Sequence, residues 1–344
     1  MPEGKKPVVP APAASAAAKE DSYSAKTHLH QPVPVTEMAT VAATALPANA
    51  PEGTLPSEVR PEIVTWEKLV EAIKASGRAY DMDMIEKAYN LANDAHKGVC
   101  RRSGEPYICH PLAVARLVLD LGMDSESIAA ALLHDVVEDT PTTLTDLTAA
   151  FGEEVAALVD GVTKLTKIQF SNIEELQAEN LRKMLLAMSR DVRVMIIKLC
   201  DRLHNMRTLA SQPANKQYKI AGETLYIYAP LANRLGLNKV KTELEDLSFR
   251  YEHPEIYQNI AKQLEETQAQ RDELFRDFTA PIRAALDKMG LKYEIKARVK
   301  TPFSIWNKMQ KKHVSFDEIY DILAVRIVFT PNVREDEIND CFSI

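Results

Sequence analysis

The sequence has 344 residues and a formal net charge of −7, from 42 basic and 49 acidic side chains. This length is sufficient for about two or three domains, and the acidic balance argues against a DNA-binding protein, which would carry a basic surface. No apolar run approaches the ~20 residues that cross a bilayer, so we expect no membrane-spanning segment. The four cysteines form neither a CxxC motif nor a disulfide-like pattern, which favours reduced thiols and a cytoplasmic location.

Residues 1–60 differ in composition from the rest of the chain. They are rich in Ala and Pro, lack periodic apolar positions and cannot bury enough surface to fold. Two lysines precede apolar residues at the start, as in a targeting segment, but Pro7, Pro10 and Pro12 interrupt that apolar stretch. We therefore expect a disordered tail.

Helical periodicity begins near Trp66 and continues to about Gly290. No alternating strand pattern occurs in this stretch, which predicts an all-α domain over 61–250 and connecting helices over 251–290. Leu-Gly and Phe-Gly pairs mark several helix ends. The predicted helices are 66–75, 82–97, 111–121, 125–138, 144–149, 153–160, 174–189, 191–210, 215–234, 238–248 and 254–288.

Around Lys292 the pattern changes. Residues 293–300 alternate like a strand, 301–312 are typical of a helix, and 322–330 form an apolar strand. This predicts the start of an α/β domain over 291–344, with too little sequence to complete its sheet. The fold class is therefore mainly α.

Four residues of metal-ligand type occur in or beside apolar helical segments. His134 and Asp135 lie in IAAALLHDVVEDT (128–140), and Asp201 lies in VMIIKLCDRLHNMRTL (194–209). Both segments are apolar nearly all round and should be buried, where an unpaired imidazole or carboxylate costs several kcal/mol. His110 precedes Pro111, which suits the first helical position and places His110 at the N-cap. A divalent cation such as Mn²⁺ would pair with all four and leave positions open for water and substrate.

Two further groups of polar residues lie on the same helices. Glu138 follows His134 by one helical turn, close enough to orient or deprotonate a water, and Asp139 is one turn after Asp135. On the later helix a polar stripe is predicted to line a cavity. It comprises Lys198, Asp201, Asn205 and Thr208.

Cations near these residues indicate a phosphorylated small molecule as the substrate. Arg101 and Arg102 stand in RRSGEPY (101–107), directly before His110. Arginine pairs with phosphate and stacks on a planar base, and a nucleotide offers both groups. Further cations in the same region are Lys164, Lys167, Arg202 and Arg207. Arg202 and Arg207 could equally be structural ion-pair partners. We expect His204 to be a packed or hydrogen-bonded residue.

Several long segments resemble the Rel/SpoT family of (p)ppGpp hydrolase-synthetases. They are RRSGEPYICHPLAVA, LLHDVVEDT, DGVTKLTK, AENLRKMLLAMSRDVRVMIIKLCDRLHNMRTL and IYAPLANRLGLNKVKTELEDLSFRY, and the likeness extends from about residue 66 to the end. The resemblance implies an all-helical HD-type metallohydrolase domain that uses Mn²⁺ to remove the 3′-pyrophosphate of ppGpp or pppGpp, giving GDP or GTP.

The resemblance also implies roles for individual residues. Glu138 and Asp139 would be the pair that activates water. The Mn²⁺ ligands would be His110, His134, Asp135 and Asp201, and all four are present, as expected of a competent hydrolase. The nucleotide contacts would be Arg101, Arg102, Ser103, Asn205 and Thr208.

Residues 291–344 are similar to the start of the family's nucleotidyltransferase-like synthetase domain, which moves pyrophosphate from ATP to GDP or GTP. By that likeness Asp321 would bind Mg²⁺, and the ATP contacts would be Arg298, Lys300, Ser304 and Lys308. The later catalytic glutamate and the acceptor-nucleotide segment are absent, so we expect a full-length parent to synthesise but not this chain. Ribosomal or regulatory partners would likewise belong only to that parent.

Two alternatives stay open at this stage. One is an HD phosphohydrolase of another nucleotide, such as a deoxynucleoside triphosphate or a cyclic dinucleotide. The other is a non-catalytic domain that senses the alarmone and regulates its neighbour. Intact ligand residues and the Glu138-Asp139 pair count against a sensor, and the RRSGEPY loop with the synthetase-like segment counts against another nucleotide.

Overall fold

The computed structural model describes residues 62–166, 190–331 and 337–343. Contacts divide the chain into Met1–Ala50 and Pro51–Ile344, and every described residue belongs to the second unit. The expected tail 1–60 and the predicted helix 174–189 lie outside the described residues.

Within the described ranges no helix is long and apolar enough to cross a membrane. All four cysteines are free thiols, as predicted.

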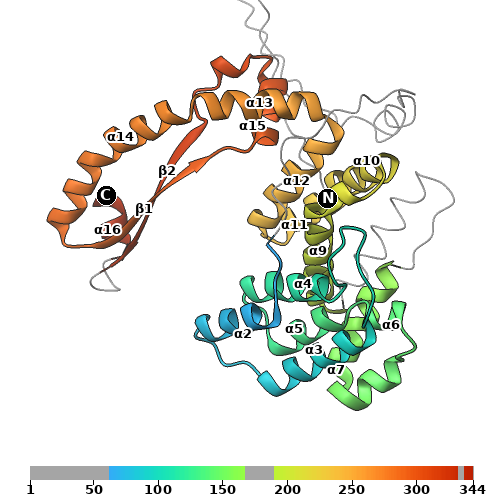
Figure 1. Ribbon diagram of the computed structural model, residues 1–344. Helices are drawn as coiled ribbons and strands as arrows, with labels where there is room; N and C mark the ends of the chain where they lie inside the picture. The colour runs from blue at the N-terminus through green and yellow to red at the C-terminus, as the bar shows by residue number, and fades with distance from the viewer. Residues whose placement is uncertain (1–61, 167–189, 332–336, 344) are drawn as a thin grey trace, which may run out of the picture. The chain divides into compact units, whose positions relative to one another are not determined.

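A first group of helices encloses the largest hydrophobic core of the described chain (Figure 1). Each presents an apolar face to its neighbours, as their sequence periodicity predicted. In chain order they are α2 Trp66–Ala75, α3 Met82–Ala95, α4 Cys109–Asp120, α5 Ser125–Leu133, α6 Val136–Asp139, α7 Leu144–Thr166, α9 Val192–Arg207, a 3₁₀ turn Leu209–Ser211, α10 Ala214–Glu223, a π-helical turn Thr224–Tyr228, α11 Ala229–Arg234 and α12 Asn238–Glu252.

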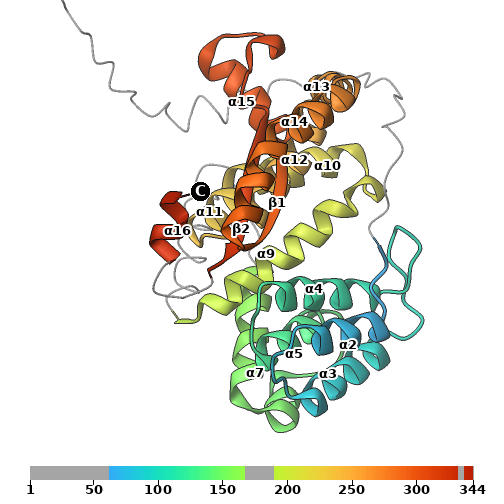
Figure 2. The same ribbon diagram turned by 90° about the vertical axis from the view of Figure 1, so that its left-hand side faces the viewer.

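Helix α5 lies at the centre of this group. Its last seven residues, Ser127–Leu133, are all buried, and it packs against α3, α4, α7 and α9 (Figure 2). The small side chains of Ala129, Ala130 and Ala131 permit close approach of those neighbours. The carboxyl end of α5, which carries His134 as its C-cap, is thereby held beside α4 and α9.

The prediction of one continuous helix over 125–138 is wrong. The helix stops at Leu133, a turn contains His134 and Asp135, and α6 begins at Val136. Asp135 is the N-cap of α6, with φ −97° and ψ −10° at the edge of the αR region, and its carbonyl accepts hydrogen bonds from the N–H groups of Glu138 and Asp139. The apolar pattern on both sides of the turn is uninterrupted, so periodicity alone gave no sign of it.

Two other helix boundaries lie at Gly152 and Thr267. The break predicted at Gly152 is confirmed, because that residue has φ 88° inside α7. The single helix predicted over 254–288 is wrong: it consists of α13 Pro254–Glu266 and α14 Gln268–Met289. They separate at Thr267, whose hydroxyl donates to the carbonyl of Gln263 at 2.7 Å and competes with the helical ladder.

The predicted strand–helix–strand sequence after Lys292 is confirmed. Strand β1 pairs antiparallel with β2, from Lys292 opposite Thr330 to Val299 opposite Leu323. A second apolar cluster joins α12, α13 and α15 around the fully buried ring of Phe249, which stacks on Trp306. The elements of this part are β1 Lys292–Val299, α15 Pro302–Lys312, a 3₁₀ turn Phe316–Glu318, β2 Leu323–Thr330 and α16 Glu337–Ser343.

Candidate metal centre

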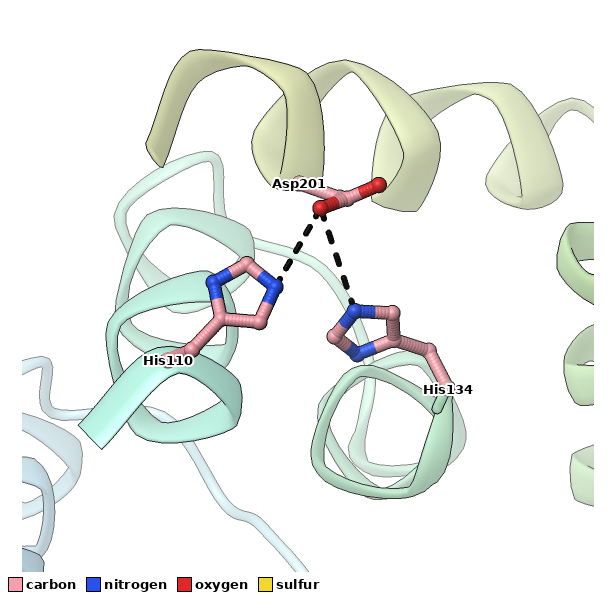
Figure 3. A group of neighbouring side chains, drawn as sticks. All are labelled: His110, His134 and Asp201. Atoms are coloured by element: carbon pink, nitrogen blue, oxygen red, sulfur yellow. Dashed lines mark ion pairs between the residues drawn. The ribbon is translucent and has the colours of Figure 1, made fainter. Parts of the chain in front are cut away.

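Three buried side chains from three helical elements meet at one point (Figure 3). His110 comes from α4, His134 from the end of α5 and Asp201 from the middle of α9. Oδ1 of Asp201 lies 3.2 Å from Nε2 of His110 and 3.9 Å from Nε2 of His134. One ligand atom from each residue lies within 4.8 Å of the others, so a single ion could contact all three.

Asp135 adds a fourth donor atom to this group. Its Oδ2 lies 3.2 Å from Nε2 of His134 and 3.7 Å from Nε2 of His110. Donor atoms bound ~2.1 Å from one first-row ion lie roughly 3 Å from one another. The spacing therefore suits a divalent cation, and the mixed nitrogen and oxygen donors suit a first-row ion.

His110 lies inside α4 rather than at its N-cap, so that part of the prediction is wrong. The helix begins at Cys109, with Ile108 at the N-cap in helical conformation. The N–H of His110 already donates to the carbonyl of Tyr107 at 2.9 Å. Pro111 is consequently the third helical residue, where its missing N–H still costs no helical hydrogen bond.

The Asp201 carboxylate is held from two sides. Lys198 donates to Oδ2 at 2.7 Å, and the amide of Asn205 donates to Oδ1 at 2.6 Å. Burial opposes ionisation of Asp201, but the Lys198 ammonium and the neighbouring imidazoles outweigh it and keep the pKa of this carboxyl well below its usual range. The hydrogen bonds show that these three residues of the predicted polar stripe share one face of α9, but of the four stripe residues only Thr208 is in the wall of the cavity described below. Asp201 is ionised at neutral pH.

The histidines respond to this negative charge in different ways. Burial alone would lower the pKa of His134, but the adjacent Asp135 carboxylate raises it to about 9. Burial dominates at His110 and lowers its pKa. The Nε2 atom of His134 is buried and makes no hydrogen bond of good geometry. A cation among the four donors would occupy the position that a proton otherwise takes on His134.

Glu138 and Asp139 lie on α6, directly after the turn that carries two of the donors. Glu138 is half-buried and Asp139 is exposed. The hydroxyl of Tyr107 lies 2.7 Å from Oδ2 of Asp135 and 3.1 Å from Oδ2 of Asp139, and so connects the two carboxylates. Burial, followed by the charge of Asp135, raises the pKa of this phenol, so it stays protonated and donates.

The predicted nucleotide-binding residues fall into two groups. Arg101 is half-buried and points to α9, where it donates to Oδ1 of Asn205 at 2.8 Å. Its other terminal nitrogen lies 3.3 Å from Nδ1 of His204. The second group faces a cavity of about 650 Å³ and comprises Arg102, Ser103 and Thr208, with His204 and Arg207 also in its wall. His204, in the wall of this cavity, contacts the donor residue His110, with 2.8 Å between their Nδ1 atoms.

Of the other basic residues considered from the sequence, the two whose side chains the structure describes contact other protein side chains. Arg207 forms two hydrogen bonds with Glu243, at 2.5 and 2.8 Å, and Arg202 lies 4.1 Å from the ring centre of Tyr228. The side chains of Lys164 and Lys167 lie outside the described residues.

Three of the residues predicted for ATP and Mg²⁺ meet beside the end of β1 and the start of β2. Lys300 lies 2.7 Å from Oδ2 of Asp321, and Lys308 contacts the same oxygen. These contacts hold the pKa of Asp321 well below its usual range. Ser304 is at the start of α15, where its N–H donates to the hydroxyl of Thr301 at 3.4 Å. Arg298 is exposed on β1, opposite Ala324.

Two residues of this site were not among the sequence candidates. Tyr107 is three residues before His110, and His204 is three residues after Asp201. The spacing of His204 from Asp201 corresponds to roughly one turn of α9, which is the signal that could have placed it beside that ligand. Tyr107 lies in the turn before α4, where helical spacing does not apply. His204 was expected to be packed or hydrogen-bonded, and it is both buried and hydrogen-bonded.

Comparisons with known proteins agree with this architecture. Residues 88–238 match the sequence model of the HD domain, and residues 297–344 match that of a region found in RelA / SpoT proteins. The GTP pyrophosphokinase of Myxococcus xanthus is 49% identical over 72% of this chain and 33% of its own length. A guanosine-3′,5′-bis(diphosphate) 3′-pyrophosphohydrolase of Vibrio cholerae is 46% identical over 76% and 37%, and the bifunctional (p)ppGpp synthase/hydrolase SpoT of Escherichia coli K12 is 46% identical over 71% and 35%.

The chain thus spans about a third of the length of the curated relatives it matches. Both matched regions occur in the order that the resemblance predicted, the HD domain first and the RelA / SpoT region second. We conclude that the chain belongs to the Rel/SpoT family.

Proposed function

We propose that this chain hydrolyses the 3′-pyrophosphate of ppGpp and pppGpp, giving GDP or GTP and pyrophosphate, with Mn²⁺ as its cofactor. The observation that carries the proposal is the convergence of four buried or half-buried donor atoms within an HD domain. The relatives from Vibrio cholerae and Escherichia coli are named for a (p)ppGpp hydrolase activity.

The Mn²⁺ ligands in this proposal are His110, His134, Asp135 and Asp201. Two imidazole nitrogens and two carboxylate oxygens suit this ion, which accepts both donor types. When bound, the cation supplies positive charge to phosphate oxygens and lowers the pKa of a water.

Glu138 and Asp139 would orient the attacking water and accept its proton. In the reaction, the water oxygen forms a bond to the phosphorus attached to O3′ of the ribose, the P–O3′ bond breaks and O3′ receives a proton. Tyr107 lies beside this pair: its single hydroxyl proton can be donated to Asp135 at 2.7 Å or to Asp139 at 3.1 Å. A positioned carboxylate that moves the proton typically contributes about 10²–10⁴-fold in rate.

The nucleotide would lie in the cavity beside His204. Arg102, Ser103 and Thr208 line that cavity and would contact the phosphates or the ribose. Arg101 contacts His204 of the cavity wall at 3.3 Å and donates to Asn205, which in turn donates to Asp201. Arginine is well suited to phosphate, which it can bind with two parallel hydrogen bonds.

A longer protein that contains this chain would also transfer pyrophosphate from ATP to GDP or GTP. In that protein Asp321 would hold Mg²⁺, and Arg298, Lys300, Ser304 and Lys308 would contact ATP. The contacts of Lys300 and Lys308 with Asp321 support a shared site, because the predicted Mg²⁺ and ATP residues lie together. The domain limits 61–250, 251–290 and 291–344 belong to the same proposal. A cytoplasmic location is favoured by the four free thiols.

The test is incubation of the purified chain with ppGpp, dGTP or a cyclic dinucleotide, each with Mn²⁺ or with EDTA. Release of pyrophosphate from ppGpp alone, and only with Mn²⁺, is the expected result. Turnover of dGTP or the cyclic dinucleotide would instead identify an HD phosphohydrolase of another nucleotide. Binding of ppGpp without turnover would identify a sensor domain. His134→Ala, which removes one donor, should abolish turnover.

A further inference from the structure

His204 lies directly behind His110, on the side away from the donor cluster. The Nδ1 atoms of the two rings are 2.8 Å apart, and both residues are buried, at 7% and 3% exposure. Two ring nitrogens at this distance form a hydrogen bond only when one carries a proton and the other presents a lone pair. The direction of this bond decides which nitrogen of His110 faces the cluster with a lone pair.

Arg101 determines the direction. Its Nη1 lies 3.3 Å from Nδ1 of His204, and a guanidinium can only donate. Nδ1 of His204 therefore carries a lone pair rather than a proton, because a proton there would face the N–H of the guanidinium. That single lone pair is shared between the shorter contact from His110 and the longer one from Arg101, and Nδ1 of His110 is the donor. In a neutral imidazole the second nitrogen then carries the lone pair, which places an acceptor, Nε2 of His110, 3.2 Å from Oδ1 of Asp201. Two acceptors at this distance repel each other unless a cation lies between them.

His134 has an equivalent arrangement with a different partner. Its Nδ1 lies 2.8 Å from the carbonyl oxygen of Ala131, and a carbonyl only accepts. Its Nε2 is consequently the atom available to a ligand. Both histidines are thus oriented through Nδ1, His134 by the backbone of its own helix and His110 by a side chain from α9. A replacement cannot remove the backbone carbonyl, but it can remove His204.

We propose that His204 is a positioning residue that fixes the ring orientation and tautomer of His110, so that Nε2 of His110 is presented to the divalent cation. The inference rests on the proposed function, because it assumes that the cluster binds Mn²⁺. His204 acts through His110 and need not touch the ion. Partners of this kind that hold a ligating histidine typically contribute about 10- to 100-fold to metal affinity.

Three replacements of His204 separate a hydrogen-bond role from packing. In His204→Asn the amide oxygen can take the position of Nδ1. In His204→Gln the amide extends toward the position of Nε2, and His204→Leu retains volume without an acceptor. The measurement is the Mn²⁺ dissociation constant of the metal-stripped chain, residues 1–344, by titration calorimetry without nucleotide. We expect wild-type and Asn proteins to bind similarly, and the Gln and Leu proteins about 10- to 100-fold more weakly. His253→Leu, a replacement of a histidine that packs on Trp306, is the matched control and should not change the constant.

The outcomes are distinguishable. If wild-type protein does not bind Mn²⁺, the proposed function fails before His204 is tested. If the Leu and Gln proteins bind Mn²⁺ as tightly as wild type, the inference is overturned while the proposed function stands. An unchanged dissociation constant with a raised KM for ppGpp would also overturn it, because His204 would then contact only the nucleotide in the cavity. If His204→Leu does not fold, the comparison of Asn with Gln still decides the question.

Discussion

Replacing Lys198 by Met should lower the free energy of unfolding of the metal-free protein by about 3 kcal/mol. The ammonium lies 2.7 Å from Oδ2 of Asp201, and the two side chains are only 10% and 7% exposed. Removal of one partner from such a buried pair typically costs about 3–5 kcal/mol, because the other charge is left without compensation. Asn205 and His110 still contact Oδ1, which favours the lower end of this range.

Urea unfolding in EDTA, followed by circular dichroism, measures this loss. Lys262→Met is the control, because its ion pair with Glu266 is 75% and 63% exposed and should contribute no more than about 0.5 kcal/mol. Adding Asp201→Asn to Lys198→Met should recover more than half of the loss, since no buried charge then stands alone. A loss below about 1 kcal/mol for Lys198→Met, or a double variant less stable than the single one, would refute the reasoning.

Three further predictions concern other parts of the described chain. Glu138→Gln should retain Mn²⁺ in calorimetry but lose about 10²-fold or more in kcat; loss of the metal would instead make Glu138 a ligand. Gly161→Ala should lower the free energy of unfolding by about 1–3 kcal/mol in urea, because the new Cβ would lie 2.7 Å from Cγ2 of the buried Val194. Adding Val194→Ala should remove this steric overlap. Burial raises the pKa of Glu252 to about 7, so its protonated form is favoured in the folded state. The stabilisation from this group is fully present below pH ~4.5 and is lost as the pH rises through ~7. After allowance for partial exposure, Glu252→Gln should remove about 1 kcal/mol from the change in the free energy of unfolding over this pH range. An unchanged pH dependence of the free energy of unfolding would contradict the raised pKa of Glu252.

Much of the site could be predicted from spacing within single helices. Lys198, Asp201 and Asn205 follow one another at three and four residues, which places them on one face of α9, and their hydrogen bonds confirm it. Residue type then indicated the chemistry, because ionisable groups in apolar segments need partners. The same reasoning could not show that His204 orients His110, since the two residues are 94 positions apart and only packing of α4 on α9 brings them together.

The turn at His134 and Asp135 lies where two donors of the cluster are adjacent in the sequence. Both residues keep backbone angles of the αR region, φ −61° and ψ −29° for His134 and φ −97° and ψ −10° for Asp135. Oδ2 of Asp135 lies 3.2 Å from Nε2 of His134, so the two side chains reach the same point although neighbouring side chains of a helix point about 100° apart. The change in backbone angles that ends α5 is therefore small, and residue type alone does not reveal it. Hydrophobic periodicity, which reports only which faces are buried, predicts a helix straight through it.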